Sequence, residues 1–421
     1  MGLLNGGVAA LTEARSEGIS PQAQEAEPAN CFRHIGALSL TKLADGLIDP
    51  KLVLSWLMGA IGAPAFLVGL LVPVRESGAL LPQLLTAPRI RAMGQRKWAW
   101  AAGSAGQGVA ALVIVAAALL LEGWLAGVAI VGALAVLAVA RSICSVSYKD
   151  VLGKTVAKPH RGTVTGAAGS VAAAGVLLFA GLLMLGLIDR FQLVIGAITL
   201  AGALWLLGAI TFATIEEEEK PGNVEAEAGL SQLALLWRDR GLGRFVLARI
   251  LLLPTALAPP YLVILAGSAG DDRFGALGAM VLASSLAALV SSWVWGRLAD
   301  RSARLVLALS GAVAAGFLAL AVGLHLAGVM GTVWAAPLAL FGLMVSYQGV
   351  RLGRSTWLVN YAPEDNRAAY TAVANTTVGV ALLAAGGFGV VASMLGADVT
   401  LGIFAVIAAL GATIAFFLDD A

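Results

Sequence analysis

The sequence contains little charge. Only 12% of its 421 residues are Asp, Glu, Lys or Arg, and 59% are hydrophobic. Soluble domains average about 25% charged and roughly 45–50% apolar residues, because a folded surface needs charge to stay in water. The composition therefore excludes a soluble globular protein and indicates an integral membrane protein. The net charge of +2 is also too small to favour a nucleic-acid partner.

Cysteine and histidine are scarce as well. Cys31 and Cys144 form no CxxC pair or disulfide framework, and His34, His160 and His325 are scattered along the chain. Zinc and redox motifs place such residues at close, regular spacing. We therefore expect no metal site and no cofactor. No hydrolytic constellation is visible either, so we do not expect an enzyme.

Long apolar runs dominate the rest of the chain. The polar segment 1–34 lacks the basic and apolar regions of a signal peptide, and we expect a disordered cytoplasmic tail there. Beyond it, stretches of about 20 apolar residues, enough to cross about 30 Å of hydrocarbon, recur twelve times. The predicted spans are 35–60, 64–88, 97–121, 123–147, 163–188, 191–213, 243–268, 273–296, 303–327, 331–352, 368–394 and 398–418.

The first two of these spans are interrupted by charges. An alternative interpretation makes 33–49 an interfacial helix and 52–72 the first span. Twelve spans are favoured, because this count leaves both termini on one side. Eighteen Lys and Arg lie in the loops after even-numbered spans, and two lie in the loops after odd-numbered spans. Since basic residues of short loops stay in the cytoplasm, this asymmetry predicts that both termini are cytoplasmic.

A polar phrase occurs twice, half a chain apart. SYKDVLGKTVAKPHRG (Ser147–Gly162) follows the fourth span, and SYQGVRLGRSTWLVNYAPEDNRA (Ser346–Ala368) follows the tenth. The GKT of the first copy does not indicate a nucleotide-binding loop, because Tyr148 stands where that loop needs a glycine. The repeat instead predicts two six-helix bundles. They would cover residues 35–213 and 243–418, joined by a charged cytoplasmic linker at 214–242.

This organisation resembles the major facilitator superfamily over residues 35–418. GRLADRSAR (Gly296–Arg304) resembles the cytoplasmic loop motif of that family, and PEDNR (Pro363–Arg367) resembles its second charged loop motif. The resemblance implies an all-α membrane fold whose two bundles rock about a mid-membrane site. It also implies a charged cytoplasmic gate, whose candidate residues are Arg91, Arg96, Gly296, Asp300, Arg301, Arg304, Glu364 and Arg367.

The first-half copy of the gate loop departs from the family pattern. TAPRIRAMGQRKW (Thr86–Trp98) keeps the basic residues but has no acidic one. We therefore expect the charge network of the gate to be complete only in the C-terminal half. The fifth span also lacks the Gly-Pro of the antiporter motif, and RSICS replaces the residues that usually surround the arginine of the fourth span.

Four charged residues within the predicted spans are candidates for proton coupling: Asp45, Glu76, Arg75 and Arg141. Ionisable side chains at membrane depth cost about 3 kcal/mol or more unless water or a partner reaches them. A carboxylate beside an arginine can exchange a proton as water access alternates. Simpler interpretations stay open: Lys42 can neutralise Asp45 on the same helix face, and Arg141 can extend to the cytoplasm.

The resemblance places spans 1, 4, 7 and 10 around a central cavity. Candidate substrate contacts are Arg249, Tyr261, Tyr347, Gln348 and Asn375, although packing roles suit the tyrosines equally well. Pro254, Pro259 and Pro260 are expected to break the seventh span. The cavity is expected to be mostly apolar, which favours an amphipathic or weakly polar organic solute over a nucleotide or sugar phosphate.

The sequence thus predicts a secondary active transporter that moves a small organic solute by alternating access, with protons as the coupling ion. We expect a monomer, surrounded by lipid, in a bacterial inner membrane. The main alternative is a non-transporting membrane assembly factor, because one fold can serve several functions. A lipid flippase is a third interpretation, and a lateral opening between the bundles would be its mark.

Overall fold

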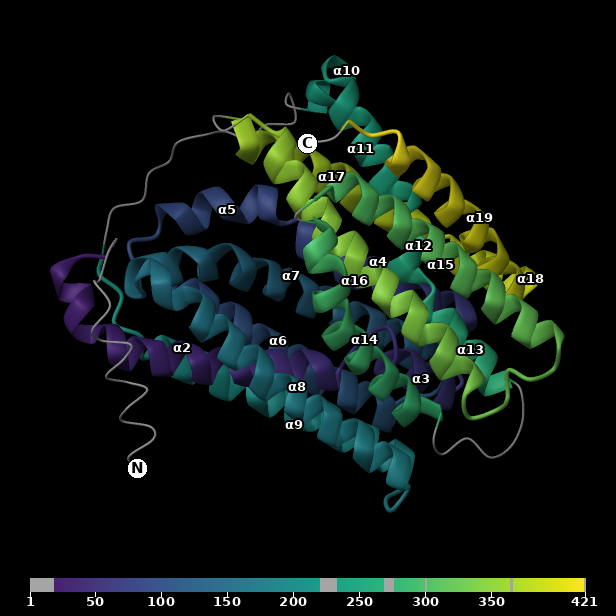
Figure 1. Cartoon of the computed structure of the whole chain (residues 1–421). Helices are drawn as coiled ribbons and strands as arrows, with labels where there is room; N and C mark the ends of the chain where they lie inside the picture. Colours follow the sequence, from purple (N-terminus) through teal and green to yellow (C-terminus); the bar gives the residue numbers. More distant parts are fainter. Residues whose placement is uncertain (1–18, 220–232, 269–275, 300, 364–365, 420–421) are drawn as a thin grey trace.

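The computed structural model describes residues 19–219, 233–268, 276–299, 301–363 and 366–419 (Figure 1). Within these ranges the protein is built from helices and contains no strand. The first half holds α2 (Pro21–Leu47), α3 (Val53–Ala60), α4 (Ala65–Leu80), α5 (Gln83–Ala92), α6 (Lys97–Leu120), α7 (Gly123–Thr155), η1 (Lys158–His160), α8 (Arg161–Leu185) and α9 (Arg190–Ala213).

The second half repeats this arrangement. It holds α10 (Leu235–Arg238), α11 (Arg240–Leu251), α12 (Pro254–Leu257), α13 (Pro259–Ser268), α14 (Ala276–Ala299), α15 (Ala303–Leu326), α16 (Ala335–Tyr361), α17 (Arg367–Ala385), α18 (Phe388–Leu395) and α19 (Ala397–Phe416). Helices α2, α6, α7, α8 and α9 pack on one another, as do α11, α14, α15, α16 and α19. Figure 1 shows the purple-to-teal group beside the green-to-yellow group. The predicted all-α fold is confirmed.

Nine helical segments of the described ranges are long and apolar enough to cross a membrane. They correspond to nine of the predicted spans. The other three are α2–α3, α4–α5 and α16, which carry Asp45, Arg75 and Arg351. Helix α16 has 27 residues and is therefore about 40 Å long, enough to cross the bilayer despite its charges. The count of twelve spans stays a prediction.

The first and seventh spans are both broken, at positions that face the centre of the protein. Helix α2 ends at Leu47 and α3 begins at Val53, with Asp49 and Pro50 in the turn between them. The Asp49 carboxylate accepts a hydrogen bond from the backbone N–H of Lys51 at 2.7 Å, which stabilises this turn. The break predicted for the seventh span is confirmed, since it divides into α11, α12 and α13, and the last two begin at prolines.

The expected disordered tail was wrong for residues 21–34, because α2 already begins at Pro21. Residues 1–18 lie outside the described residues. The polar side chains of this segment are satisfied by neighbouring loops: Glu27 accepts from the backbone N–H of Ala157 at 2.8 Å, and Asn30 donates to the carbonyl of Glu216 at 3.0 Å. The C-terminal bundle likewise begins before residue 243, at α10 and α11.

The two ends of the helix bundle differ in chemistry. We call the end that holds the starts of α2, α6, α8 and α17 the basic end, because it carries residues such as Lys97, Arg161 and Arg367. We call the other the opposite end. It holds the turns that join α3 to α4, α6 to α7, α8 to α9 and α18 to α19.

The two halves meet through close helix contacts of glycines near the opposite end. Helix α8 packs on α14, and α4 packs on α17 and α18. A Cβ atom on Gly69 of α4 would lie 2.5 Å from Cα of Gly389 in α18, and one on Gly389 would lie 2.6 Å from the carbonyl oxygen of Phe66. A Cβ on Gly278 of α14 would lie 2.9 Å from the carbonyl oxygen of Ala180. The opposite end is therefore closed by contacts that only glycine permits.

Replacing Gly389 with valine should push α4 and α18 apart and open this end. In a background where both native cysteines are replaced by alanine, Ser55→Cys reports on access from the opposite end. We expect several-fold faster labelling by a membrane-impermeant maleimide in Gly389→Val. Gly196→Val is the matched control, since a Cβ there meets nothing within 4 Å. Equal labelling rates in the two variants would show that the glycine contact does not hold this end closed.

Candidate functional site

Asp45 joins three helices at the centre of the first half. Its carboxylate on α2 accepts a hydrogen bond from Nη2 of Arg75 on α4 at 2.7 Å and another from Nη1 of Arg141 on α7. Both contacts are ion pairs. The side chain of Arg141 is 40% exposed although it lies well inside the longest helix, so it borders a space that water can enter.

These contacts decide between the interpretations that the sequence left open. Lys42 lies within electrostatic range of Asp45 but forms no ion pair with it, and its Nζ donates to the carbonyl of Thr165 on α8 at 3.0 Å. Arg141 points to Asp45 instead of extending to the basic end. The structure thus brings together three of the four proton-coupling candidates. The fourth, Glu76, lies within electrostatic range of both arginines.

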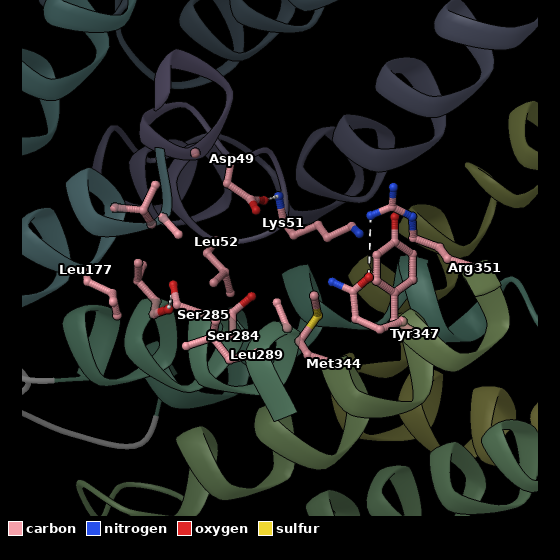
Figure 2. A pocket seen from close by; sticks show the side chains of 16 residues that line it. Asp49, Lys51, Leu52, Leu177, Ser284, Ser285, Leu289, Met344, Tyr347 and Arg351 are labelled. Atoms are coloured by element: carbon pink, nitrogen blue, oxygen red, sulfur yellow. Dashed lines mark hydrogen bonds between the residues drawn. The ribbon is translucent and has the colours of Figure 1, made fainter. Parts of the chain in front are cut away.

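A cavity of about 350 Å³ lies between the two halves, beside this ion-pair cluster (Figure 2). The break between α2 and α3 supplies Asp49, Lys51 and Leu52, and the remaining wall comes from α8, α14 and α16. Two of the predicted substrate contacts, Tyr347 and Gln348, line it. A second hollow continues from the same residues of α16 toward Trp295 and Ser355. These parts of α14 and α16 lead toward the basic end, so the cavity extends in that direction.

Lys51 is a cavity residue that sequence analysis did not identify. It is 6% exposed, and its Nζ lies 3.3 Å from the centroid of the Tyr347 ring, which is a close cation–π contact. Figure 2 shows the ammonium group extending from the turn after α2 toward Tyr347 and Arg351. The signal in the sequence was the DPK turn itself, since a lysine beside a helix break in a membrane span faces protein or water, not lipid.

Arg249 and Asn375 contact each other as a pair. Nη2 of Arg249 on α11 donates to Oδ1 of Asn375 on α17 at 3.2 Å. Arg249 is 4% exposed, so it does not extend to the membrane surface, and within the described residues its Nε has no hydrogen-bond partner. Arg354 of α16 lies within electrostatic range of this guanidinium.

Tyr261 does not line the cavity described above. It is 2% exposed and packs edge-on against Phe404 of α19, with ring centroids 5.6 Å apart. Its hydroxyl would lie 2.7 Å from a Cβ on Gly69, so it belongs to the closed contact between the halves. The prediction that it contacts substrate therefore does not fit this conformation, and the packing role fits.

Comparison with known proteins identifies the family. The sequence matches the model of the Major Facilitator Superfamily over residues 37–383. The chain belongs to this superfamily. It is therefore a secondary transporter, and two helical halves around a central cavity fit an alternating-access mechanism. A comparison with curated protein sequences gives no significant match.

Solved transporter structures share the fold at low sequence identity. A mutant of the nucleoside transporter NupG is 12% identical with a TM-score of 0.70, and the alignment covers 92% of this chain and 99% of that one. A POT family transporter in complex with a thioalcohol-conjugated peptide is 12% identical with a TM-score of 0.69, covering 92% and 95%. A POT family transporter in complex with 5-aminolevulinic acid is 12% identical with a TM-score of 0.68, and the alignment covers 92% of this chain and 95% of that one. At this identity the likeness shows the fold alone.

The gate of this superfamily member is more complete in its first half than the sequence suggested. Arg96 of the basic loop pairs with Asp150 near the end of α7 at 3.1 Å, so an acidic residue of that helix supplies the missing charge. Lys154 pairs with Glu217 at 2.9 Å, and Glu217 also accepts from the backbone N–H of Lys97 at 2.8 Å. The expectation of a network complete only in the second half was therefore wrong.

The second-half gate candidates are described only in part. Asp300 and Glu364 lie outside the described residues, as does the side chain of Arg91 in the first half. Arg304 donates to the carbonyls of Phe416 and Leu418 at 3.4 Å, which connects the start of α15 to the end of α19. The remaining candidates lie at helix ends on the basic side: Gly296 near the end of α14, Arg301 just before α15 and Arg367 at the start of α17.

Asp239 forms a polar cluster in the second half that the sequence did not reveal. Its carboxylate accepts hydrogen bonds from the hydroxyls of Tyr361 at 2.6 Å and Tyr370 at 2.8 Å, and it caps the first turn of α11. Burial by itself would raise the pKa of Asp239, but these hydrogen bonds stabilise the carboxylate and hold the pKa below its usual value. The cluster thus joins α11, α16 and α17 at the basic end.

Glu217 should make a measurable contribution to stability. Its side chain is 0% exposed, and in Glu217→Gln the ammonium of Lys154 would lose its charged partner. We expect the free energy of unfolding to fall by about 2 kcal/mol, the range of a hydrogen bond to a charged group. Titration of the detergent-solubilised protein with a denaturing detergent measures this. The neighbouring, exposed Glu219→Gln is the control, and an equal effect of both substitutions would contradict the structural role of Glu217.

Proposed function

We propose that this transporter moves a small organic solute and couples its movement to protons through Asp45. The main support is that the carboxylate of Asp45 accepts hydrogen bonds from two arginines on different helices, and that one of them, Arg141, is partly exposed. Both guanidinium groups contact the same carboxylate oxygen, Oδ1, of Asp45. Proton transfer at that oxygen requires at least one arginine to withdraw, which ties it to a movement of α4 or α7 relative to α2.

The same contacts suggest the consequence of that movement. A protonated Asp45 no longer compensates the charge of Arg75 and Arg141, and a buried guanidinium without a counter-charge is unfavourable by several kcal/mol. The arginines would then turn to Glu76, which lies within electrostatic range of both. An exchange of partners between two carboxylates is a two-state arrangement of the kind that conformational switching requires.

The conformation described here corresponds to a state open toward the cytoplasm. Glycine contacts close the opposite end, and the cavity extends toward the basic end. The excess of Lys and Arg in the loops of the basic end supports a cytoplasmic location for it and for both termini. We further propose twelve spans, a monomer without enzymatic activity, and a location in a bacterial inner membrane.

Solute transport accounts for the charged centre better than the alternatives do. An assembly factor that does not transport has no need to pair Asp45 with Arg75 and Arg141 at membrane depth. A flippase would need an opening to lipid between the halves, whereas α8 packs on α14 and α4 packs on α17. The POT family structures with a conjugated peptide and with 5-aminolevulinic acid show this fold holding small organic molecules.

Asp45→Asn should abolish proton movement driven by solute, because asparagine is isosteric but does not titrate. The measurement uses proteoliposomes with an internal pH dye and a panel of amino acids, dipeptides, nucleosides and organic acids. Glu76→Gln is expected to reduce the signal as well. Asp189→Asn, at the exposed cap of α9 on the opposite end, is the control. A proton signal of wild-type size in Asp45→Asn would rule out this coupling mechanism.

A further inference from the structure

Lys51 forms no ion pair among the described residues, although the carboxylates of Asp49 and Glu76 lie within electrostatic range of it. It is 6% exposed and lines the cavity, and in this part of the chain its ammonium group forms no ion pair or hydrogen bond. The face of the Tyr347 ring is its nearest contact, at 3.3 Å. Burying a cation is costly, and a cation–π contact offsets only part of that cost. Glu76 compensates Lys51 incompletely, because Arg75, Arg141 and Arg354 interact with the same carboxylate. The ammonium group is therefore available to an anion that enters the cavity.

The charges around the cavity are unequal. Within the described part of the chain, three carboxylates are grouped with six basic side chains, which leaves an excess of three positive charges. The carboxylates are Asp45, Asp49 and Glu76, and the basic residues are Lys51, Arg75, Arg141, Arg249, Arg351 and Arg354. The charge of Asp45 is already paired with Arg75 and Arg141, so it compensates little of the positive charge on the second-half arginines.

Besides Lys51, the excess of positive charge lies on the second half. Arg249 is 4% exposed, and its contacts in the described ranges are the neutral amide of Asn375 and the ring of Phe245. Arg351 makes a long hydrogen bond of 3.5 Å to Gln348, another neutral group. Arg351 and Arg354 are three residues apart on α16 and therefore lie on the same helix face. Arg354 shares Glu76 with Lys51, Arg75 and Arg141, so an anion in the cavity would add counter-charge on this side of the protein.

The cavity is also polarised. Figure 2 shows Lys51, Tyr347 and Arg351 together on one side, Leu177 and Leu289 on the other, and Leu52 and Met344 between them. Ser284 and Ser285 of α14 add hydroxyl groups on the apolar side. A volume of about 350 Å³ falls within the range of small-molecule sites. This arrangement matches a molecule with an acidic head and an apolar body.

We infer that the substrate is an amphipathic organic anion, whose acidic group binds between Lys51 and Arg351 and whose apolar body lies against Leu52, Leu177 and Met344. The inference rests on the proposed transport function and names the chemical class that the cavity takes. It narrows the expectation from sequence, which favoured an amphipathic or weakly polar organic solute, by adding an acidic group that Lys51 and Arg351 would bind. The acid can be a carboxylate or a phosphate monoester, since both share the charge and the acceptor oxygens.

Equilibrium binding to the purified full-length protein in lipid nanodiscs tests the inference. The probes are 3-phenylpropionate and 2-phenylethyl phosphate, compared by calorimetry with the neutral 3-phenylpropionamide and the cationic 2-phenylethylamine. We expect at least one acid to bind about tenfold or more tightly than the amide, since a charge-assisted hydrogen bond corresponds to that factor. Equal binding of acid and amide, tighter binding of the amine, or no binding of either acid would overturn the inference.

Substitutions locate the binding. Lys51→Met and Arg351→Gln should each weaken acid binding about tenfold and leave amide binding unchanged, whereas Lys51→Arg should retain the preference for the acid. Arg351 is exposed, so its variant remains informative if Lys51→Met does not fold. Arg238→Gln, on exposed α10, is the matched control. An acid preference that survives both Lys51→Met and Arg351→Gln would overturn the assignment.

Transport is measured separately, by uptake of the same acids into proteoliposomes. Acid binding without uptake would contradict the proposed transport function and leave the anion site standing. Uptake of other solutes by a protein that binds neither acid would support transport and overturn the inference alone. The two proposals therefore fail in distinguishable ways.

Discussion

The need to compensate charge inside a bilayer explains why the helices of the first half are arranged as they are. Asp45, Arg75 and Arg141 would each be unfavourable at membrane depth alone. Together they form two ion pairs that bring α2, α4 and α7 to one point. Of the segments that lack the apolar character of a membrane span, α2–α3 and α16 line the cavity, and α4 supplies Arg75 to the ion pair with Asp45. Their charges are stabilised by each other and by water, so these helices depend on the bundle to cross the membrane.

The two halves use the same frame for different chemistry. Ser147 and Ser346, equivalent residues of the repeated phrase, each donate to the carbonyl four residues earlier on their helix. The tyrosines that follow them have diverged: Tyr148 packs edge-on against His34 in the interior of the first half, whereas Tyr347 holds Lys51 in the cavity. Among the described residues, the carboxylates of the central cluster belong to the first half, and the second half contributes cations. The repeat thus gives the architecture, and the departures from it give the site its polarity.

Sequence reasoning predicted the helices and the charged residues but not how those residues pair. Prolines identify the break in the seventh span because their effect is local. The pairing of Asp45 with Arg75 and Arg141 depends on tertiary packing across 30 and 96 residues, which no spacing rule provides. Glu217 was missed because it belongs to a run of four glutamates, and such a run predicts a solvated linker. Only the fold shows that one of the four is enclosed by Lys97 and Lys154.

The contacts at the two ends differ in a way that bears on alternation. At the basic end, polar contacts lie within a half: Arg96 with Asp150 and Lys154 with Glu217 in the first, Asp239 with Tyr361 in the second. Separation of the halves at this end leaves these bonds unbroken. At the opposite end, the halves meet through close apolar packing around Gly69 and Gly389, which must be lost when that end opens. An alternate state therefore has to recover this packing energy from new contacts between the halves at the basic end, and neutralisation of the excess positive charge by a bound anion would lower the repulsion that opposes their approach.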